Sequence, residues 1–543
     1  MPRLCRIPKR LFQALRSSVR LSMVVAPLLL ISTVALIPAL LFAQAATPNE
    51  MRAVRAFDAA KSSKANALDL EAFLAKMPKG GDLHMHLSGA VYAETYLKDA
   101  AADYLCVDPK ALALVQHIGL FNARPACPDG DVSATSVFAN QRLYDLLVDS
   151  FSMRGFVPSS GVSAHDQFFA TFDRFGGTFV SHKGEWLDEV ATRAARQNEQ
   201  YLEIMDSFTL GMALALAPSL HTDLSNSVNF AEARAEIPQS TIDAAIEQAR
   251  MSVDAIEARR NDLEHCGTPQ AQSGCKVQVR WIVGVLRDFT PAQIFTQTLL
   301  GFALAASDPR VVAINYLRAE DWHGSLAEYH LGMQIVNYCH SLYPRVHITL
   351  HAGELAPGLV PPEDLTFHIR EAVELGHAER IGHGVDVMYE NDPHALLKEM
   401  AEKHVMVEIN LTSNDVILGI RPPYHPLPEY RAAHVPVALS TDDEGVSRID
   451  LTHEYVRAAM EYGLGYLDLK AMARTSLEHS FLSGESLWQR PDDFTSVKAA
   501  CAGQTLGAAS PTARCQALLG SSERAAQQWE MERRFAAFES NLP

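Results

Sequence analysis

The sequence predicts an α/β fold of the (β/α)8 barrel type, and two observations carry this prediction. Short apolar runs rich in Val and Ile recur eight times along the chain, with longer helical patterns between them. Several of these runs end in His, Glu or Asp, and barrel enzymes gather their chemistry at the carboxyl ends of the strands. The expected strands cover residues 81–87, 200–205, 277–285, 311–317, 346–351, 380–385, 405–411 and 435–440.

Helical patterns separate the expected strands. Apolar residues spaced three or four apart predict helices such as 186–200, 241–261, 326–341, 362–375 and 393–403. The chain has no internal repeat, heptad run or low-complexity linker. One catalytic domain with decorations therefore fits the sequence better than a string of modules.

Three segments lie outside a bare barrel. Residues 46–76 indicate an N-terminal helical lead-in, and 77–487 indicate the barrel itself. Within it, about 99–163 predict an insertion after the first strand, because they hold two cysteines, a Pro-Ala-Cys-Pro-Asp-Gly stretch and several short helical patterns. Residues 488–543 predict a C-terminal helical extension that ends in an amphipathic helix over Ser521–Phe538.

Residues 1–45 have the pattern of a signal peptide. A basic stretch is followed by a mostly apolar run, Leu21–Phe42, and then by Ala43-Gln44-Ala45, which matches the small-x-small cleavage rule. We expect cleavage near Ala45 or Ala46 and an exported protein, periplasmic or secreted. The alternative is an uncleaved membrane anchor, because about 22 apolar residues nearly span a bilayer.

The cysteines fit an oxidising compartment. Of the eight, seven remain after Cys5 leaves with the signal, and three short loops predict the pairs Cys106–Cys127, Cys266–Cys275 and Cys501–Cys515. Sequence alone does not prove this connectivity, and Cys339, in a helical stretch, is expected to be buried and free. The chain contains no Cys-x-x-Cys, which excludes zinc ribbons and the His/Cys-ligated cytidine-deaminase site.

Charge narrows the class of partner. The formal net charge is −17, and without the basic N-terminal segment it is about −23. Such an acidic protein disfavours nonspecific nucleic-acid binding. The expected partner is therefore a small molecule, with no nucleic acid and no stable membrane association after signal cleavage. The sequence leaves the oligomeric state open.

His84 and His86 share one face of the first expected strand, since alternate residues of a strand point the same way. Two neutral imidazoles side by side suit a borderline cation such as zinc. A lone His-x-His is more often a pair of ordinary half-buried histidines. Three further strand ends change this balance.

His351-Ala352-Gly353-Glu354 follows one expected strand, Ile381-Gly382-His383-Gly384 another, and Ser440-Thr441-Asp442-Asp443 ends the last. His347, near the start of its strand, is more plausibly structural. Any one of these motifs has an ordinary explanation, such as a solvated turn for the Asp pair. Their delivery of His, Glu and Asp to one rim predicts a metal site with an acid beside it.

These four blocks resemble the signatures of the adenosine deaminase family within the metal-dependent amidohydrolases. The resemblance runs from about Met77 to Tyr455, and Ser413-Asn414 and Glu454-Tyr455 also fit it. The opening Met77–Gly80, together with the export signal, is similar to the secreted adenosine-deaminase-related growth factor branch. The implied fold is a TIM barrel of the metal-dependent hydrolase type.

The resemblance implies a role for each matched residue. One zinc ion per chain would be held by His84, His86, His351 and Asp442, with an open position for water. Glu354 would donate a proton to the purine ring nitrogen beside the reacting carbon, and His383 would orient the water. The implied substrate-binding residues are Asp443, which meets the five-membered ring, and Ser88, Arg318 and Gly353.

Three positions depart from the family pattern. Ser88 stands where an Asp usually touches the sugar, and Arg318 falls where a glycine backbone usually meets the purine. Asn410-Leu411 replaces a Cys-Pro pair, which we interpret as packing. Glu320 and Asp321 fit the secreted branch. The zinc chemistry survives these changes, whereas specificity for adenosine is weakened.

The expected activity is that of an adenosine deaminase-like aminohydrolase, which converts adenosine or 2'-deoxyadenosine to inosine or its deoxy form and ammonia. Zinc would lower the pKa of water from 15.7 to roughly 7, and a carboxyl group kept protonated in a dry pocket would protonate the ring. Two alternatives stay open. The same chemistry could act on adenine, a modified adenosine or AMP, or the protein could be a catalytically weak purine-binding or signalling module.

Overall fold

Eight parallel strands form one barrel in the computed structural model, which describes residues 47–542 apart from 65–66, 116–126, 160 and 179–180. They follow one another around the barrel in chain order, so each is hydrogen-bonded to its sequence neighbours within this set. All eight predicted strands are confirmed, with bounds shifted by a few residues. They are β1 (Gly80–His86), β5 (Glu199–Asp206), β6 (Gln278–Leu286), β7 (Val311–Leu317), β8 (His347–Ala352), β9 (Arg380–His383), β10 (Met406–Ile409) and β11 (Val437–Leu439).

The barrel is nearly closed, and its seam lies between β11 and β1. A parallel bridge joins Met85 to Asp442, three residues beyond the end of β11. The N–H of Asp442 donates to the carbonyl of His84 at 2.9 Å, and the N–H of His86 donates to the carbonyl of Asp442 at 3.2 Å. The seam therefore sets three of the predicted metal ligands side by side through their backbones.

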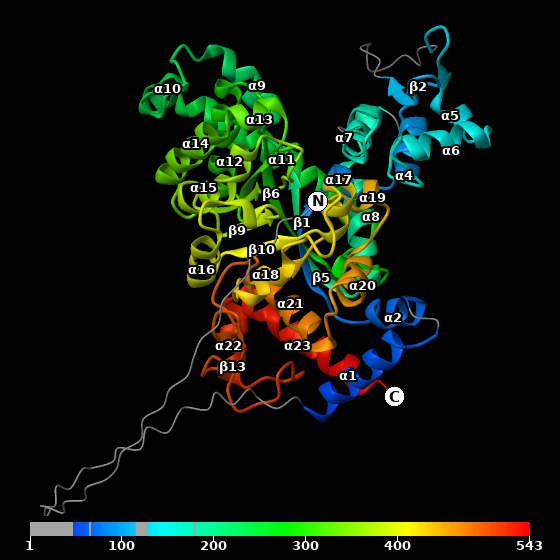
Figure 1. Ribbon diagram of the computed structural model, residues 1–543, viewed down its shortest axis with the longest axis vertical. Helices are drawn as coiled ribbons and strands as arrows, with labels where there is room; N and C mark the ends of the chain where they lie inside the picture. Colours follow the sequence, from blue (N-terminus) through cyan, green and yellow to red (C-terminus); the bar gives the residue numbers. More distant parts are fainter. Residues whose placement is uncertain (1–46, 65–66, 116–126, 160, 179–180, 543) are drawn as a thin grey trace, which may run out of the picture. The chain divides into compact units, whose positions relative to one another are not determined.

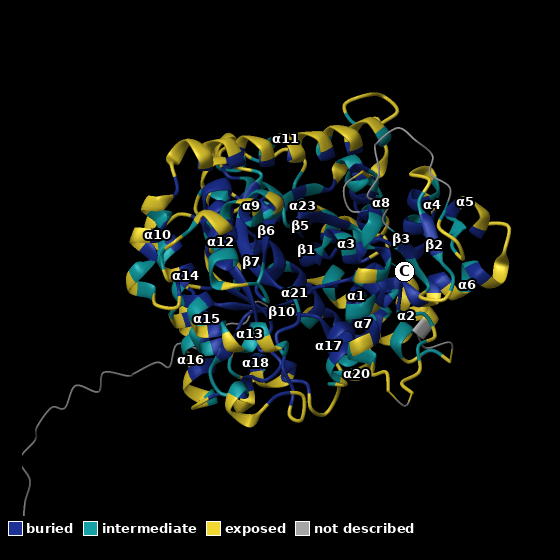
Figure 2. Ribbon diagram, turned by 90° about the horizontal axis from the view of Figure 1, so that it is seen from above, coloured by how far each residue is buried: buried dark blue, intermediate teal, exposed yellow. Residues whose placement is uncertain are grey.

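Helices cover the outside of the strands. Figure 2 shows the strands as buried, while α11 presents exposed residues along much of its length. In Figure 1, α12, α14 and α15 lie beside one another. The main outer helices are α8 (Lys183–Arg196), α11 (Gln239–Leu263), α12 (Pro291–Ser307), α14 (Tyr329–Leu342), α15 (His368–Glu374), α16 (Pro393–Lys403), α20 (Leu451–Glu461) and α21 (Tyr466–Glu478).

The segment after β1 holds a small sheet as well as helices. Helix α4 (Ala93–Ala102) leads into an antiparallel sheet of β2 (Cys106–Asp108), β3 (Ala113–Val115) and β4 (Val132–Ser133), in the order β3-β2-β4. Helices α5 (Ala134–Val137), α6 (Gln141–Ser150) and α7 (Ala164–Phe175) follow. The sequence pattern indicated only short helices here, because strands of two or three residues are too short to show an alternation.

The two ends of the described chain pack together beneath the barrel strands. Helix α1 (Pro48–Lys61) contacts the C-terminal helix α23 (Glu523–Ser540) and α21, and helix α2 (Ala67–Leu74) contacts α20. Lys470 of α21 joins both ends, since its ammonium lies 2.8 Å from Glu50 and 2.6 Å from Glu539. The region after residue 487 also holds a hairpin of β12 (Trp488–Arg490) and β13 (Asp493–Val497), followed by α22 (Ala513–Ser521).

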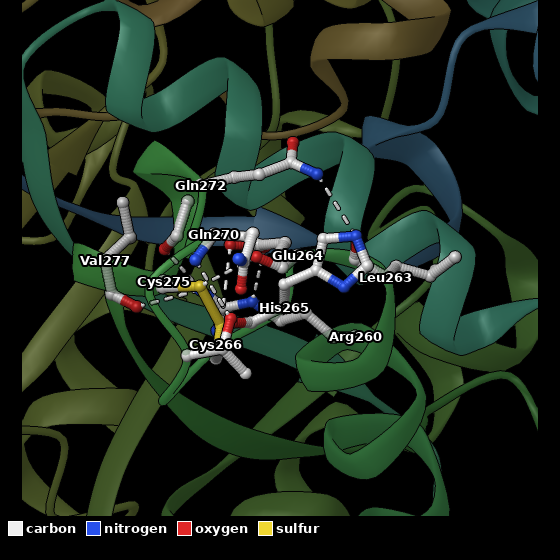
Figure 3. Close-up of a disulfide and its surroundings, with 11 residues drawn as sticks. Arg260, Leu263, Glu264, His265, Cys266, Gln270, Gln272, Cys275 and Val277 are labelled. Atoms are coloured by element: carbon white, nitrogen blue, oxygen red, sulfur yellow. Dashed lines mark hydrogen bonds and ion pairs between the residues drawn. A yellow bond between two sulfur atoms is a disulfide. The ribbon is translucent and has the colours of Figure 1, made fainter.

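Three disulfides join the predicted pairs. Cys106 is bonded to Cys127, Cys266 to Cys275 and Cys501 to Cys515, and the remaining described cysteine, Cys339, is buried and free, as expected. Figure 3 shows the second bridge, which closes the loop between α11 and β6. The salt bridge from Arg260 to Glu264 lies beside it, at 2.9 Å.

Within the described ranges, none of the helices combines the length and the apolar character needed to cross a membrane. The predicted signal peptide, residues 1–45, lies outside the described residues.

Candidate metal centre and active site

Five polar side chains converge where the barrel closes. They come from β1, β8, β9 and the end of β11, and they are His84, His86, His351, His383 and Asp442. Nε2 of His86 lies 3.3 Å from Nε2 of His351 and 3.1 Å from Oδ1 of Asp442. Nε2 of His84 lies 3.4 Å from the same carboxylate oxygen.

These separations fit a tetrahedral zinc site. Ligand atoms about 2.0–2.1 Å from one zinc ion lie about 3.3 Å from one another at the corners of a tetrahedron. The three distances given above are 3.1, 3.3 and 3.4 Å. The four predicted ligands thus lie near one another in the structure, with Nε2 of His86 next to His351 and Asp442. The buried group whose possible ligand atoms all lie within 4.8 Å of one another is His84, His351, His383 and Asp442, so His383 stands where the prediction has His86.

Hydrogen bonds from neighbouring side chains orient the rings and the carboxylate of the predicted ligands. Nδ1 of His84 lies 2.6 Å from Oε2 of Glu408, and Nδ1 of His351 lies 2.9 Å from Oδ1 of Asn315. An acceptor at Nδ1 places the ring proton there and leaves the Nε2 lone pair free for a cation. The hydroxyl of Ser413 likewise donates to the outer oxygen of Asp442 at 2.7 Å.

The electrostatics of the cluster favour a positive charge at its centre. Nε2 of His84 is fully buried and has no hydrogen-bond partner. Although burial opposes it, the neighbouring carboxylates of Asp442 and Glu408 raise the pKa of His84 to about 10. Burial also opposes ionisation of Asp442, yet His84 and His86 hold its pKa well below the usual range. A metal cation satisfies the same field and the unpaired nitrogen together.

His383 is the fifth member of the cluster and sits differently. Its Nε2 lies 4.0 Å from Oδ2 of Asp442, and its Nδ1 faces the amide of Asn414 at 2.9 Å. Burial lowers the pKa of His383 to about 3, so the ring is neutral at neutral pH. The predicted water-orienting histidine therefore lies at the edge of the predicted ligand set.

Glu354 is held on a fixed turn directly after β8. The N–H groups of Gly353 and Glu354 donate to the two oxygens of Glu320, at 3.1 and 2.9 Å, and Gly353 has a φ of +74° that favours glycine. Oε1 of Glu354 is buried without a hydrogen-bond partner. Burial and the nearby Asp442 raise the pKa of Glu354 well above its ordinary value, which favours the protonated carboxyl group.

Asp443 lies directly over Gly89, the third residue of the short helix α3 (Leu87–Ala90). A β-carbon added at Gly89 would meet Oδ1 of Asp443 at 1.4 Å. That oxygen is buried and unpartnered, and burial together with Asp442 raises the pKa of Asp443 to about 8. The raised pKa favours the protonated carboxyl group, and its Oδ1 is free beside the cluster.

A pocket of about 310 Å³ opens onto the cluster. Its floor includes His86, His351, Glu354, Asp442 and Asp443. The rest of the lining is mostly aromatic and aliphatic, with several polar residues; besides Ser88 and Arg318 it consists of Leu87, Phe168, Phe169, Phe172, Trp186, Met205, Leu210, Leu286, Leu317 and Ile417, with Lys183, Asp206 and Ser207. This size falls within the range of small-molecule sites, about 300–1,000 Å³.

Two of the other predicted substrate-binding residues, Ser88 and Arg318, line the pocket, whereas Gly353 lies in the turn behind it. Arg318 has a φ of +85°, which explains why the family pattern places a glycine there. Its guanidinium stacks on the Trp322 ring at 4.8 Å and lies 3.3 Å from Asp288. The arginine is therefore already engaged at the rim.

Some functional residues escaped the sequence analysis. Glu408 and Asn315 lie inside strands, where they hydrogen-bond to the predicted ligands His84 and His351. In the sequence, each could have been noticed only as a polar residue within an otherwise apolar strand. His347 lies away from the cluster, as expected, since its ring stacks on Phe481 and its Nδ1 contacts Glu379 at 2.8 Å.

Comparison with known proteins adds three findings. The sequence profile of the family described as adenosine deaminase matches residues 212–489, just over half of the chain. This segment holds His351, Glu354, His383 and Asp442, whereas the His-x-His of β1 precedes it. The structure alone brings the two parts of the cluster together.

Among curated relatives, an adenine deaminase of Rhizobium leguminosarum bv. trifolii is 29% identical over 222 residues, which are 40% of this chain and 63% of that protein. An adenosine deaminase of Escherichia coli is 39% identical over 140 residues, 26% of this chain and 39% of that protein. The matched part spans less than two thirds of either relative. The crystal structure of adenine deaminase from Arthrobacter aurescens aligns with a TM-score of 0.47 at 15% identity, covering 75% of this chain and 94% of that chain.

Proposed function

Since this chain belongs to the adenosine deaminase family, we propose that it is a zinc-dependent aminohydrolase that converts adenosine or 2'-deoxyadenosine to inosine or deoxyinosine and ammonia. One observation carries the proposal. Three imidazole nitrogens and a carboxylate oxygen, with separations of 3.1, 3.3 and 3.4 Å among them, lie beside a buried Glu354 in the lining of one pocket.

The proposed ligands of a single Zn²⁺ are His84, His86, His351 and Asp442. The ion would supply a water whose pKa falls from 15.7 to roughly 7, and thus a nucleophile at neutral pH. Glu408, Asn315 and Ser413 hold the ligands in place from behind.

The remaining residues act on the purine and on the attacking water. Glu354, whose raised pKa favours the protonated form, gives its proton to the ring nitrogen beside the reacting carbon, so that negative charge does not build up there. Asp443, whose pKa is also raised, donates to the acceptor nitrogen of the five-membered ring. His383 orients the attacking water at the edge of the cluster. Ser88, which lines the pocket, would contact the sugar.

The pocket favours a nucleoside over the free base adenine. It continues from the metal cluster to the Lys183–Asp206 pair, whose ammonium and carboxylate lie 2.6 Å apart and offer partners for sugar hydroxyls. AMP fits less well, because both cationic side chains of the lining, Lys183 and Arg318, are already paired with carboxylates. A module without catalysis is less well supported, because it would be expected to lack the acid or one of the proposed ligands, and the sequence carries all of them.

Export is proposed from the same sequence. Residues 1–45 would be a cleaved signal peptide, and residues 46–76, 77–487 and 488–543 would form the lead-in, barrel and extension of the mature protein. The three disulfides support an oxidising compartment, periplasmic or extracellular. N-terminal sequencing of exported protein tests this: a start near Ala46 is expected, and retention of Leu21–Phe42 would contradict it.

A substrate panel tests the activity. Adenosine, 2'-deoxyadenosine, adenine and AMP are each followed by ultraviolet absorbance, with and without a chelator, and zinc is counted per chain. We expect turnover of the two nucleosides that chelation abolishes and zinc restores. Faster turnover of adenine or AMP would overturn the nucleoside assignment, and no turnover of any aminopurine by zinc-loaded protein would overturn the activity.

A further inference from the structure

A buried chain of hydrogen bonds runs behind His383. It starts at Leu427, whose backbone N–H donates to Nδ1 of His425 at 3.2 Å. A backbone N–H can only donate, so this Nδ1 is an acceptor and carries no proton. Burial lowers the pKa of His425 to about 3, so the ring is neutral and its single proton sits on Nε2.

That proton fixes the next link. Nε2 of His425 lies 3.1 Å from Oδ1 of Asn414 and donates to it. The amide of Asn414 is thereby oriented, with its nitrogen turned toward Nδ1 of His383 at 2.9 Å. Because an amide nitrogen is only a donor, Nδ1 of His383 is an acceptor as well.

His383 must then carry its proton on Nε2. Among the described residues, the nearest carboxylate oxygen to its Nδ1 is Oε1 of Glu354, which at 3.6 Å is beyond hydrogen-bond distance. The amide of Asn410, at 3.4 Å, approaches the same Nδ1. Nε2 of His383 is buried, has no hydrogen-bond partner and lies 4.0 Å from Asp442.

We propose that His425 and Asn414 are positioning residues that lock His383 in the tautomer with its proton on Nε2. His383 is then a hydrogen-bond donor to the attacking water and is not a ligand of the ion, although it lies in the same buried cluster as His84, His351 and Asp442. The identity of its acceptor rests on the proposed function. The tautomer itself does not.

Asn414→Asp reverses the relay with no change in shape. A carboxylate accepts from both neighbours, so it would draw the proton of His383 to Nδ1 and leave Nε2 bare. Selective ¹⁵N labelling of histidine in the zinc-loaded full chain reads this directly, because protonated, bare and metal-bound ring nitrogens differ in chemical shift. His383→Gln assigns the resonance. We expect Nε2–H in the wild type and Nδ1–H in N414D.

Activity follows the tautomer. A catalytic histidine in the wrong tautomer costs up to about 10⁴-fold in kcat, so N414D should lose 10²- to 10⁴-fold in kcat with zinc content and KM little changed. His425→Gln keeps an amide N–H for Asn414 and should retain most of the activity, whereas His425→Leu should not. Asn337→Asp is the matched control, because Asn337 accepts from His377 at 2.7 Å on α14, away from the cluster.

Each possible result either supports or contradicts the proposed tautomer of His383. A wild-type His383 with its proton on Nδ1, or with a metal-bound Nε2, overturns the proposal, as does an N414D variant whose tautomer is unchanged. A loss of thermal stability without a change of tautomer would make Asn414 merely structural and also overturns it. If the protein deaminates no aminopurine, the nitrogen shifts still report the tautomer, so failure of the proposed function is distinguished from failure of the relay.

Discussion

Substituting Gly89 by Ala should disable substrate binding without disturbing the metal site. The added β-carbon would lie 1.4 Å from Oδ1 and 2.2 Å from Cγ of Asp443, whereas ordinary contacts begin at 3.4 Å. To reach an ordinary contact distance, the carboxyl group must move by about 2 Å. A misplacement of about 1 Å already costs about 10²-fold in rate. We expect G89A to lose at least about 10²-fold in kcat/KM for adenosine with full zinc occupancy.

The cause is steric and can be isolated. Gly89 is helical with an ordinary φ, so alanine brings no backbone strain of its own. Asp443→Gly removes the obstructing side chain, so the double variant G89A/D443G should match D443G alone, which makes the two effects strongly non-additive. Gly211→Ala is the control, because Gly211 lies in helix α9 (Leu210–Leu216) with nothing within 4 Å of an added β-carbon.

Steady-state kinetics and metal analysis read the result. Wild-type kcat/KM in G89A at one zinc per chain would refute the placement of Asp443 against substrate. Simple additivity in the double variant would refute the steric link between the two residues.

Three further changes separate metal binding, proton transfer and substrate choice. His351→Ala should lose both zinc and activity by metal analysis and absorbance assay, and retained zinc would remove it from the ligand set. Glu354→Gln should keep zinc but lose about 10²- to 10⁴-fold in kcat. Burial raises the pKa of Glu354 in the wild type. The wild-type kcat/KM should therefore stay level through the pH range in which an ordinary glutamate loses its proton, and should fall only at higher pH. A fall that begins near pH 4.5 would contradict the protonated acid. Arg318→Gly should change the ratio of kcat/KM between adenosine and AMP, measured side by side, while zinc affinity is unchanged. An unaltered ratio would show that Arg318 does not affect the choice of substrate.

The barrel could be predicted because its strands are long apolar runs with helices between them. The strand at Val277–Val285, for example, is found one residue further on, at Gln278–Leu286. The sheet in the segment after β1 could not be predicted in this way. Its strands have two or three residues, and what holds Cys106 of β2 there is a disulfide to Cys127, a long-range bond with no local periodicity.

The site divides along the same line. Residues at strand ends, such as His351 and Asp442, can be recognised from the sequence, because a polar group there ends an apolar run at the rim of the barrel. Glu408 and His425 act through a partner from another part of the chain, at separations of 324 and 11 residues, so no spacing in the sequence relates them to the ligands. Their roles follow only from which nitrogen faces which oxygen.

The seam of the barrel explains why these ligands stand where they do. Strands β11 and β1 are joined by one bridge, at Met85 and Asp442, and the turn before it is tied across by Thr441, whose N–H and hydroxyl both donate to Asp82, at 3.1 and 2.6 Å. An ion shared by His84, His86 and Asp442 would span this short junction. Closing the barrel between β11 and β1 therefore also places three of the four proposed ligands, His84, His86 and Asp442, side by side, whereas the fourth, His351, comes from β8.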